Sequence, residues 1–320
     1  MTFEDLPTVP RSEELIDKAF SRAARSGRAK SGVDAQQSML LTASNIISDN
    51  LQNVTTTWPD FEEIDPFYAE LADAVVDGGI DALRQHLSEV MWAGRKASDI
   101  RSEYQSRLQG DSQTARKIRK QAFARLADIT REVSDDLLAL GEARDTLKHL
   151  PDIRADEPTI VIAGYPNVGK STFVNSVTNA RNEVASYPFT TKQIRVGHIE
   201  RDHIRYQLID TPGLLDRPAE ERNDIESQAV SALTHLAGAI LVLIDASAAC
   251  GYPVDVQLAL RDEIEARFSD SVLTVCSKAD RSRDLDADHY LSVEENEGVD
   301  ELLDTAVEAV DYEIELPFEG

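Results

Sequence analysis

Residues 164–171 read GYPNVGKS and fit the pattern G-x-x-x-x-G-K-[S/T]. They follow an apolar run, TIVIAG at 159–164, and precede STFVNSVTNA at 171–180, a segment that reads as a helix. Between a strand and a helix, the glycines let successive backbone N–H groups point inward, beside a helix N-terminus that favours anions. The stretch predicts a phosphate-binding loop (P-loop) in an α/β fold.

Two residues of this loop have predicted roles in binding phosphate. Lys170 is expected to bridge the outer phosphates of a nucleotide, and Ser171 to offer its hydroxyl to Mg²⁺. The nucleotide-binding residues predicted from the loop are Asn167, Val168, Gly169, Lys170, Ser171 and Thr172.

Two later stretches supply the partners that a P-loop needs. YPFTTK at 187–192 contains Thr190 and Thr191, and we expect Thr191 to close over the terminal phosphate and reach Mg²⁺. In QLIDTPGLLD at 207–216, Asp210 is expected to hold Mg²⁺ through water, and the Gly213 N–H to contact the terminal phosphate. The predicted Mg²⁺ ligands are Ser171, Thr191 and Asp210, and the predicted catalytic residues are Lys170, Thr191 and Gly213.

The base is predicted from SKAD at 277–280, which ends the run SVLTVC. The Asp280 carboxylate can accept hydrogen bonds from N1–H and the N2 amino group of guanine, whereas adenine has no donors at those positions. Lys278 is expected to lie over the base. The usual guanine signature is Asn-Lys-x-Asp, so Ser277 stands where asparagine is expected. Ser292 and Val293 are predicted to present backbone N–H groups to guanine O6.

The two halves of the chain have different periodicities. Residues 159–320 alternate β-branched apolar runs with helical stretches, which predicts a mainly parallel sheet with helices on both faces. Residues 11–150 carry apolar stripes at steps of three and four, and the clearest stripe predicts a helix over 115–150. Together the stripes predict an all-α helical bundle. We therefore predict a helical domain at 1–151, a linker at 152–158 and an α/β P-loop domain at 159–320.

The composition indicates a soluble, strongly acidic protein. The net charge is −25, and acidic residues lie on well-patterned helices, as in proteins of a salt-rich cytoplasm such as that of halophilic archaea. No apolar run approaches the roughly 18 residues of a membrane span, and Cys250 and Cys276 show no metal-ligand spacing. We expect a cytoplasmic monomer that does not contact a membrane.

One basic segment interrupts this acidity. Residues 84–131 carry 11 basic and 5 acidic residues. Cations off the apolar stripe are expected to face outward, where they can contact RNA phosphates, although a solvated face with internal ion pairs is the alternative. The candidate RNA-binding residues are Arg116, Lys117, Arg119, Lys120 and Arg131.

Taken together, the motifs resemble the nucleolar GTP-binding protein family, Obg-related GTPases of large ribosomal subunit assembly. The resemblance includes GYPNVGKSTFVNSVT, ASYPFTTKQIRVGHIE, YQLIDTPGLLDRPAEERNDIESQAVSALTHLAG, IDASAACGYPVDVQLAL and, in the helical half, WPDFEEIDPFYAELADAV. It implies an archaeal GTPase that binds GTP and Mg²⁺ and associates with large-subunit rRNA or a pre-ribosomal particle. The departures are Ser277, the acidic surface and the absence of the long C-terminal extension of eukaryotic members.

Leu214 bears on how such a protein hydrolyses GTP. In the best-known GTPases a glutamine at this position orients the attacking water, but related GTPases carry a hydrophobic residue there. We expect K⁺ bound near Asn167, or the ribosomal partner itself, to provide what the missing glutamine would contribute to ordering the attacking water. The alternative is that Asn167 serves only to stabilise the loop. The predicted function is a slow GTPase that acts as a ribosome assembly factor. The other candidates are a nucleotide-sensing scaffold with negligible hydrolysis and a housekeeping NTPase unrelated to ribosomes.

Overall fold

The computed structural model describes residues 3, 5–148, 150, 153–154, 156–178, 183–186, 193–212, 214–268 and 271–310. Its contacts divide the chain into two units. The helical unit comprises Thr2–Ile64 and Val76–Lys148, and the α/β unit comprises Asp65–Val75 and His149–Gly320. None of the described helices is long and apolar enough to cross a membrane.

Within the described residues, the α/β unit contains one seven-stranded sheet in the order β2-β3-β4-β1-β5-β6-β7. The strands are β1 (Thr159–Ala163), β2 (Glu183–Ser186), β3 (Gln193–Arg201), β4 (Ile204–Asp210), β5 (Ala237–Asp245), β6 (Ser271–Ser277) and β7 (His289–Leu291). Pairs from β4 to β7 are parallel, whereas β3 is antiparallel to both β2 and β4. The sheet is therefore mainly parallel, as the sequence predicted.

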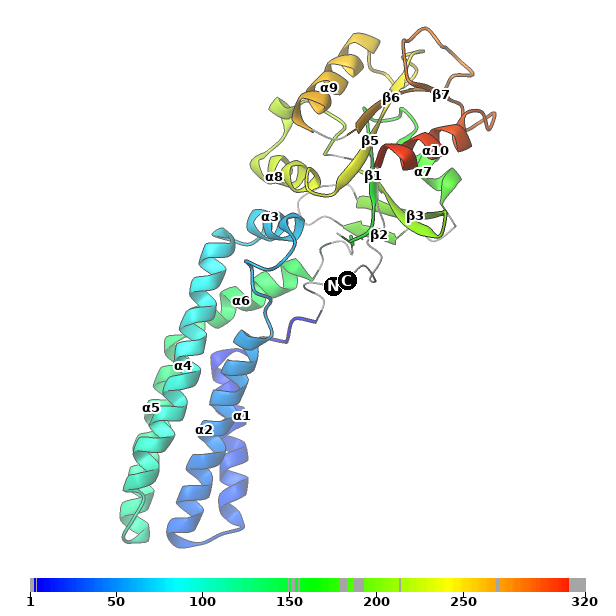
Figure 1. Cartoon of the computed structure of the whole chain (residues 1–320). Helices are drawn as coiled ribbons and strands as arrows, with labels where there is room; N and C mark the ends of the chain where they lie inside the picture. The colour runs from blue at the N-terminus through cyan, green and yellow to red at the C-terminus, as the bar shows by residue number, and fades with distance from the viewer. Residues whose placement is uncertain are drawn as a thin grey trace, which may run out of the picture. The chain divides into compact units, whose positions relative to one another are not determined.

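Helices cover both faces of this sheet. They are α7 (Lys170–Val177), α8 (Asp224–Leu233), α9 (Val254–Arg267) and α10 (Val299–Val310), with a short 3₁₀ helix at Ala219–Glu221. In Figure 1, α8 and α9 lie on one side of the sheet and α7 and α10 on the other. All residues of β1 are buried, and so are nearly all residues of β5, because central parallel strands are covered on both faces.

The α/β unit also includes α3 (Pro66–Val75), a helix from within the first half of the sequence. Phe67 and Leu71 are fully buried. Glu70 bonds His235 at 3.0 Å, and the Tyr68 hydroxyl donates to the carbonyl of Ile153. Tertiary packing thus groups α3 with the α/β unit, whereas the sequence-based boundaries place it in the helical domain at 1–151.

The helical unit consists, among the described residues, of α1 (Ser12–Arg28), α2 (Gly32–Thr56), α4 (Gly79–Arg107), α5 (Ser112–Glu132) and α6 (Ser134–Leu147). The core residues Leu15, Ile47, Leu83 and Leu126 are at most 1 % exposed and come from four of these helices. The apolar stripes of the sequence therefore meet in one core, which confirms the predicted bundle.

One helix prediction was wrong. The continuous helix expected over 115–150 is two helices, α5 and α6, which meet at Val133 with φ −99° and ψ 23°. Ser134, Asp135 and Asp136 follow this residue, and serine and acidic residues favour the first turn of a new helix. The apolar periodicity continues across the break, so it did not reveal it.

Candidate nucleotide-binding site

The loop between β1 and α7 is curled by residues with positive φ. Gly164 has a φ of +126°, and a Cβ there would come within 2.4 Å of the Leu243 carbonyl oxygen on β5. Asn167 and Gly169 have φ values of 65° and 112°, and α7 begins at the next residue, Lys170. The glycines thus permit both the close approach to β5 and the turn into the helix.

Lys170 is held against this loop. Its side chain is buried, and Nζ donates to the carbonyl oxygens of Gly164 at 2.6 Å and Tyr165 at 3.0 Å. A cation fixed in the concave loop at a helix N-terminus is well placed to bind the phosphates of a nucleotide.

Two of the three predicted Mg²⁺ ligands are in contact. The Ser171 hydroxyl donates to Asp210 Oδ2 at 2.5 Å, and Asp210 is fully buried at the end of β4. Asp210 Oδ1 is also buried and, within the described residues, has no hydrogen-bond partner. Burial raises the pKa of this carboxyl, against the lowering effects of Ser171 and of the positive Lys170 and Arg195.

An unsatisfied carboxylate oxygen fits a site that needs a cation or its water. No group of three or more His, Cys, Asp or Glu side chains that could hold a metal occurs in the described part of the chain. Mg²⁺ at nucleotide sites needs only one or two protein carboxylates, because substrate phosphates and waters complete the shell. Ser171 and Asp210 therefore fit a Mg²⁺ ion brought by the nucleotide.

The structure describes only some of the remaining phosphate-side residues. Thr190, Thr191 and Gly213 lie outside the described residues. Leu214 is fully buried, and its N–H donates to the Thr211 carbonyl at 3.2 Å. The carbonyl of Leu215 accepts a 2.9 Å hydrogen bond from the Gly164 N–H, so the turn after Asp210 is tied directly to the P-loop.

A pocket of about 150 Å³ joins the P-loop to the predicted base-binding turn. The predicted residues that line it are Val168, Gly169, Thr172, Ser277, Lys278, Asp280 and Val293. They come from the start of α7, the end of β6 and the segment after β7, which are far apart in sequence. The structure thus brings both halves of the predicted site together.

Asp280 is oriented by Ser292. The fully buried Ser292 donates its hydroxyl to Asp280 Oδ1 at 2.7 Å, while its N–H donates to the Glu297 carbonyl at 3.0 Å. The Ser292 N–H is therefore engaged within the protein and does not face guanine O6, contrary to the sequence-based expectation. Ser292 instead orients Asp280, and Val293, which lines the pocket, remains the predicted N–H donor to guanine O6.

Ser277 leaves a buried hydroxyl unsatisfied. The residue is 3 % exposed, and its Oγ has no hydrogen-bond partner among the described residues. Serine at this position therefore fixes neither the P-loop nor the base-binding turn through its side chain.

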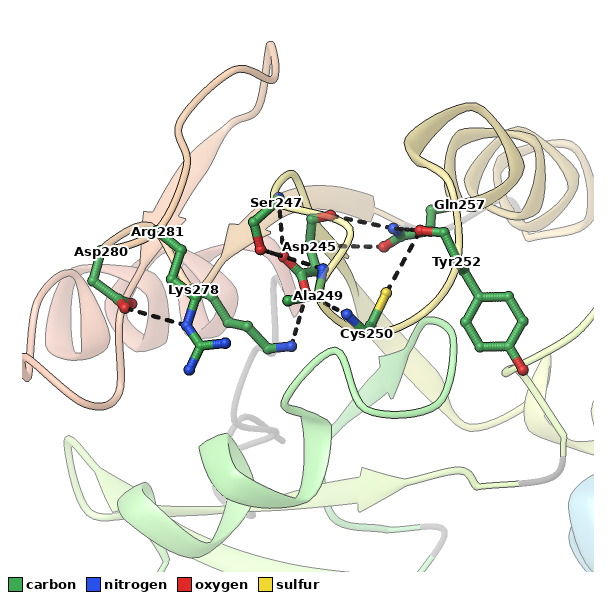
Figure 2. Close-up of polar contacts among 9 residues, drawn as sticks. All are labelled: Asp245, Ser247, Ala249, Cys250, Tyr252, Gln257, Lys278, Asp280 and Arg281. Atoms are coloured by element: carbon green, nitrogen blue, oxygen red, sulfur yellow. Dashed lines mark hydrogen bonds and ion pairs between the residues drawn. The ribbon is translucent and has the colours of Figure 1, made fainter.

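One residue next to the base-binding turn was not predicted from the sequence. Asp245, fully buried at the end of β5, accepts a 2.7 Å hydrogen bond from Lys278 Nζ (Figure 2). The available signal was the run AILVLID, which ends in aspartate as IRYQLID does at Asp210. Burial alone raises the pKa of Asp245, but hydrogen bonds from Lys278 and Ser247 outweigh it and hold the pKa below its ordinary value.

The candidate RNA-binding cations of α5 differ in their contacts. Arg119 donates to Gln36 Oε1 at 2.8 Å and lies over the Phe123 ring, and Arg131 donates to Glu13 at 2.6 Å. Arg116, Lys117 and Lys120 are exposed and form no ion pair with the described residues. Of the five candidates, these three are the ones without an internal contact in the described part of the chain.

A P-loop on the first strand of a mainly parallel sheet, sharing a pocket with a Lys-x-Asp turn, defines a P-loop GTP-binding protein. The family models that match the chain agree with this class of protein. Residues 3–154 match the model described as NOG1 N-terminal helical domain, and residues 159–278 match the 50S ribosome-binding GTPase model.

Full-length relatives show the particular family. An uncharacterized protein of Methanocaldococcus jannaschii is 37 % identical over 87 % of this chain and 81 % of its own length. Nucleolar GTP-binding protein 1 of Eremothecium gossypii is 33 % identical over 89 % of this chain and 46 % of its own length, and that of Saccharomyces cerevisiae is 31 % identical over 94 % and 48 %. The chain belongs to the nucleolar GTP-binding protein family, and it spans about half the length of these two eukaryotic relatives.

Among solved structures, a putative nucleolar GTP-binding protein 1 of Plasmodium falciparum is 35 % identical to this chain. The match covers 51 % of this chain and 90 % of that one, with a TM-score of 0.46.

Proposed function

We propose that the protein hydrolyses GTP to GDP and phosphate and acts as an assembly factor in large ribosomal subunit biogenesis. The observation that supports the enzymatic part is the pocket that joins the P-loop to Asp280. The family model matched by residues 159–278 is described as a ribosome-binding GTPase, which supports the ribosomal setting.

Hydrolysis at this site relies on positioning and charge. Lys170 would bind the outer phosphates, and Ser171 and Asp210 would hold Mg²⁺, which would supply positive charge against the charge that develops on the transferred phosphoryl group. Thr191 and the Gly213 N–H are the proposed contacts to the terminal phosphate. Leu214 is fully buried and cannot hydrogen-bond the attacking water, so the intrinsic rate is slow.

We propose that K⁺ provides part of what the missing glutamine would contribute to catalysis. Asn167 is exposed in the P-loop and has a φ of 65°. A monovalent cation held there adds charge beside the phosphates. GTP turnover is expected to be faster in KCl than in NaCl at equal ionic strength, and Asn167→Ala is expected to abolish the difference. Equal rates in both salts would remove K⁺ from the mechanism.

The ribosomal partner is proposed to contact the exposed cations of α5. Arg116, Lys117 and Lys120 remain unpaired within the described residues of an acidic protein, and phosphate contacts need such outward cations. The absence of aromatic residues among them favours the RNA backbone over base stacking. Arg119 and Arg131 are weaker candidates, because internal contacts engage them.

Sedimentation with ribosomal particles tests this surface. The triple variant Arg116→Gln, Lys117→Gln, Lys120→Gln is expected to lose association with large-subunit particles and to keep GDP affinity. A matched control is Arg11→Gln, Lys148→Gln, Arg267→Gln, which removes the same charge outside α5. If both variants lose binding equally, net charge rather than this surface governs the association.

The buried Leu214 also favours a second candidate, a nucleotide-sensing scaffold with negligible hydrolysis. Single-turnover GTP cleavage, measured with and without large-subunit precursors, distinguishes the two. Stimulation by the particles supports the enzyme, whereas cleavage that stays negligible in both conditions supports the scaffold. A housekeeping NTPase unrelated to ribosomes predicts no co-sedimentation with particles at any salt concentration.

A further inference from the structure

The turn after β5 is organised around the side chain of Asp245 (Figure 2). Ser247 donates to Oδ1 from its N–H at 3.0 Å and from its hydroxyl at 2.5 Å, and the Cys250 N–H donates to Oδ2 at 2.9 Å. Gln257 on α9 accepts from the Asp245 N–H at 2.8 Å and donates to the Tyr252 carbonyl at 2.8 Å. The carboxylate is thereby fixed before any ligand binds.

Lys278 completes this arrangement. The register of β5 and β6 pairs Asp245 with Ser277, which places the next residue, Lys278, beside the carboxylate. Its Nζ donates to Oδ2 at 2.7 Å, and its backbone has a φ of 51°, which a residue with a side chain rarely adopts. Because the ammonium is neutralised within the protein, the part of Lys278 left to line the pocket is its methylene stem.

The same turn reaches the P-loop on its other side. The ring of Tyr252 lies on that of Tyr165, the second residue of the P-loop, with centroids 4.3 Å apart and an interplanar angle of 35°. Ser277, in contrast, offers a buried hydroxyl without a partner among the described residues. A connection between the base-binding turn and the P-loop therefore runs through the turn after β5 and not through the side chain at position 277.

We infer that Asp245 is a positioning residue for guanine recognition: it holds the Lys278 stem against the base from a turn that is also packed on the P-loop. Asp245 itself does not contact the nucleotide. This role rests on guanine-nucleotide binding in the described pocket and does not depend on hydrolysis.

A double-mutant cycle measured with a fluorescent GDP analogue tests the role. Asp245→Asn is expected to weaken GDP binding about tenfold, the effect of one lost hydrogen bond to a charged group. In a Lys278→Ala background the same substitution is expected to change affinity by less than about twofold, because the group it positions is gone. The matched control is Asp262→Asn, an exposed carboxylate on α9 that is paired with Arg261 and is expected to have no effect.

Two results overturn the inference. One is an unchanged affinity in Asp245→Asn, and the other is a loss of equal size with and without Lys278, which would show that Asp245 supports only the fold. Thermal unfolding without nucleotide checks that each variant is folded. If Asp245→Asn does not fold, Ser247→Ala removes only one bond to the same carboxylate. It is expected to give a smaller loss that also disappears without Lys278. Because GDP is the product, failure of the proposed hydrolysis leaves these affinities unchanged.

Discussion

Two aspartates end the strands on either side of β1, and their surroundings differ. Asp210 ends β4 and Asp245 ends β5, and both are fully buried. Asp245 accepts bonds from Ser247, Cys250 and Lys278, whereas Asp210 accepts one from Ser171 and leaves Oδ1 without a partner in the described structure. The pKa of Asp210 is accordingly raised by burial, and that of Asp245 is lowered by its donors despite burial.

This difference separates the two ends of one site. On the base side, protein donors satisfy the Asp245 carboxylate before a ligand arrives. The phosphate side keeps a desolvated carboxylate oxygen without a hydrogen-bond partner in the described structure, which fits the Mg²⁺ that we propose the nucleotide brings. Substitutions on the two sides should therefore differ in their dependence on Mg²⁺ and in their effect on the stability of the free protein.

The largest effect is expected on the phosphate side, from Lys170→Ala. The ammonium is held in the P-loop by two backbone carbonyls, and the substitution removes the charge-assisted bond that we propose it makes to the outer phosphate of GDP. GDP affinity, measured by titration calorimetry, is expected to fall on the order of 100-fold or more. Lys148→Ala, at the end of α6, is the control. A loss below about tenfold would mean that the backbone of the loop, rather than Lys170, dominates phosphate binding.

On the base side, Asp280→Asn is expected to have the next largest effect. The substitution replaces one acceptor for the guanine N1–H and N2 groups with a donor, so GDP binding falls about 100-fold. Binding of xanthosine diphosphate improves, because the new amide can donate to the oxygen at C2. Both changes are expected to persist in EDTA, unlike the loss in a Mg²⁺-side variant. A GDP affinity that falls without any gain for the xanthine nucleotide would mean that Asp280 acts on the fold and not on the base.

The paired variants Asp210→Asn and Asp245→Asn are expected to shift stability in opposite directions. The folded-state pKa of Asp210 lies above its unfolded value, so stability of the metal-free protein falls as pH rises through the unfolded pKa, and the loss is complete above the folded pKa. Asp245 has a lowered pKa, so its charge stabilises the fold above its unfolded pKa, and this stability is lost as pH falls through the folded pKa. Melting in EDTA near neutral pH should show Asp210→Asn higher and Asp245→Asn lower than the parent, each by about 3 °C.

Both differences in melting temperature should shrink as the pH falls into the range where aspartates protonate. Asp210→Asn should at the same time weaken GDP binding only when Mg²⁺ is present. Shifts of the same sign in the two variants would show that the two carboxylates do not differ as their contacts indicate.

The sequence predicted the elements and the site better than it predicted specific contacts. Buried parallel strands are continuous apolar runs, so β1, β4, β5 and β6 could be located from composition alone. The break at Val133 escaped because the apolar spacing is the same in α5 and α6. The packing of α3 with the α/β unit, the Ser292–Glu297 bridge and the Asp245–Lys278 ion pair all depend on tertiary contacts that local patterns do not encode.

The smallest effect is expected from Ser277→Ala, on the base side. The hydroxyl is buried and has no partner among the described residues, so its removal discards a desolvated polar group rather than a bond. GDP affinity should stay within about twofold of the parent, and the melting temperature without nucleotide should stay equal or rise slightly. A clear loss of GDP affinity would show that bound nucleotide supplies the partner that Ser277 lacks. The base side would then also be completed by its ligand, and the contrast with Asp210 would be one of degree.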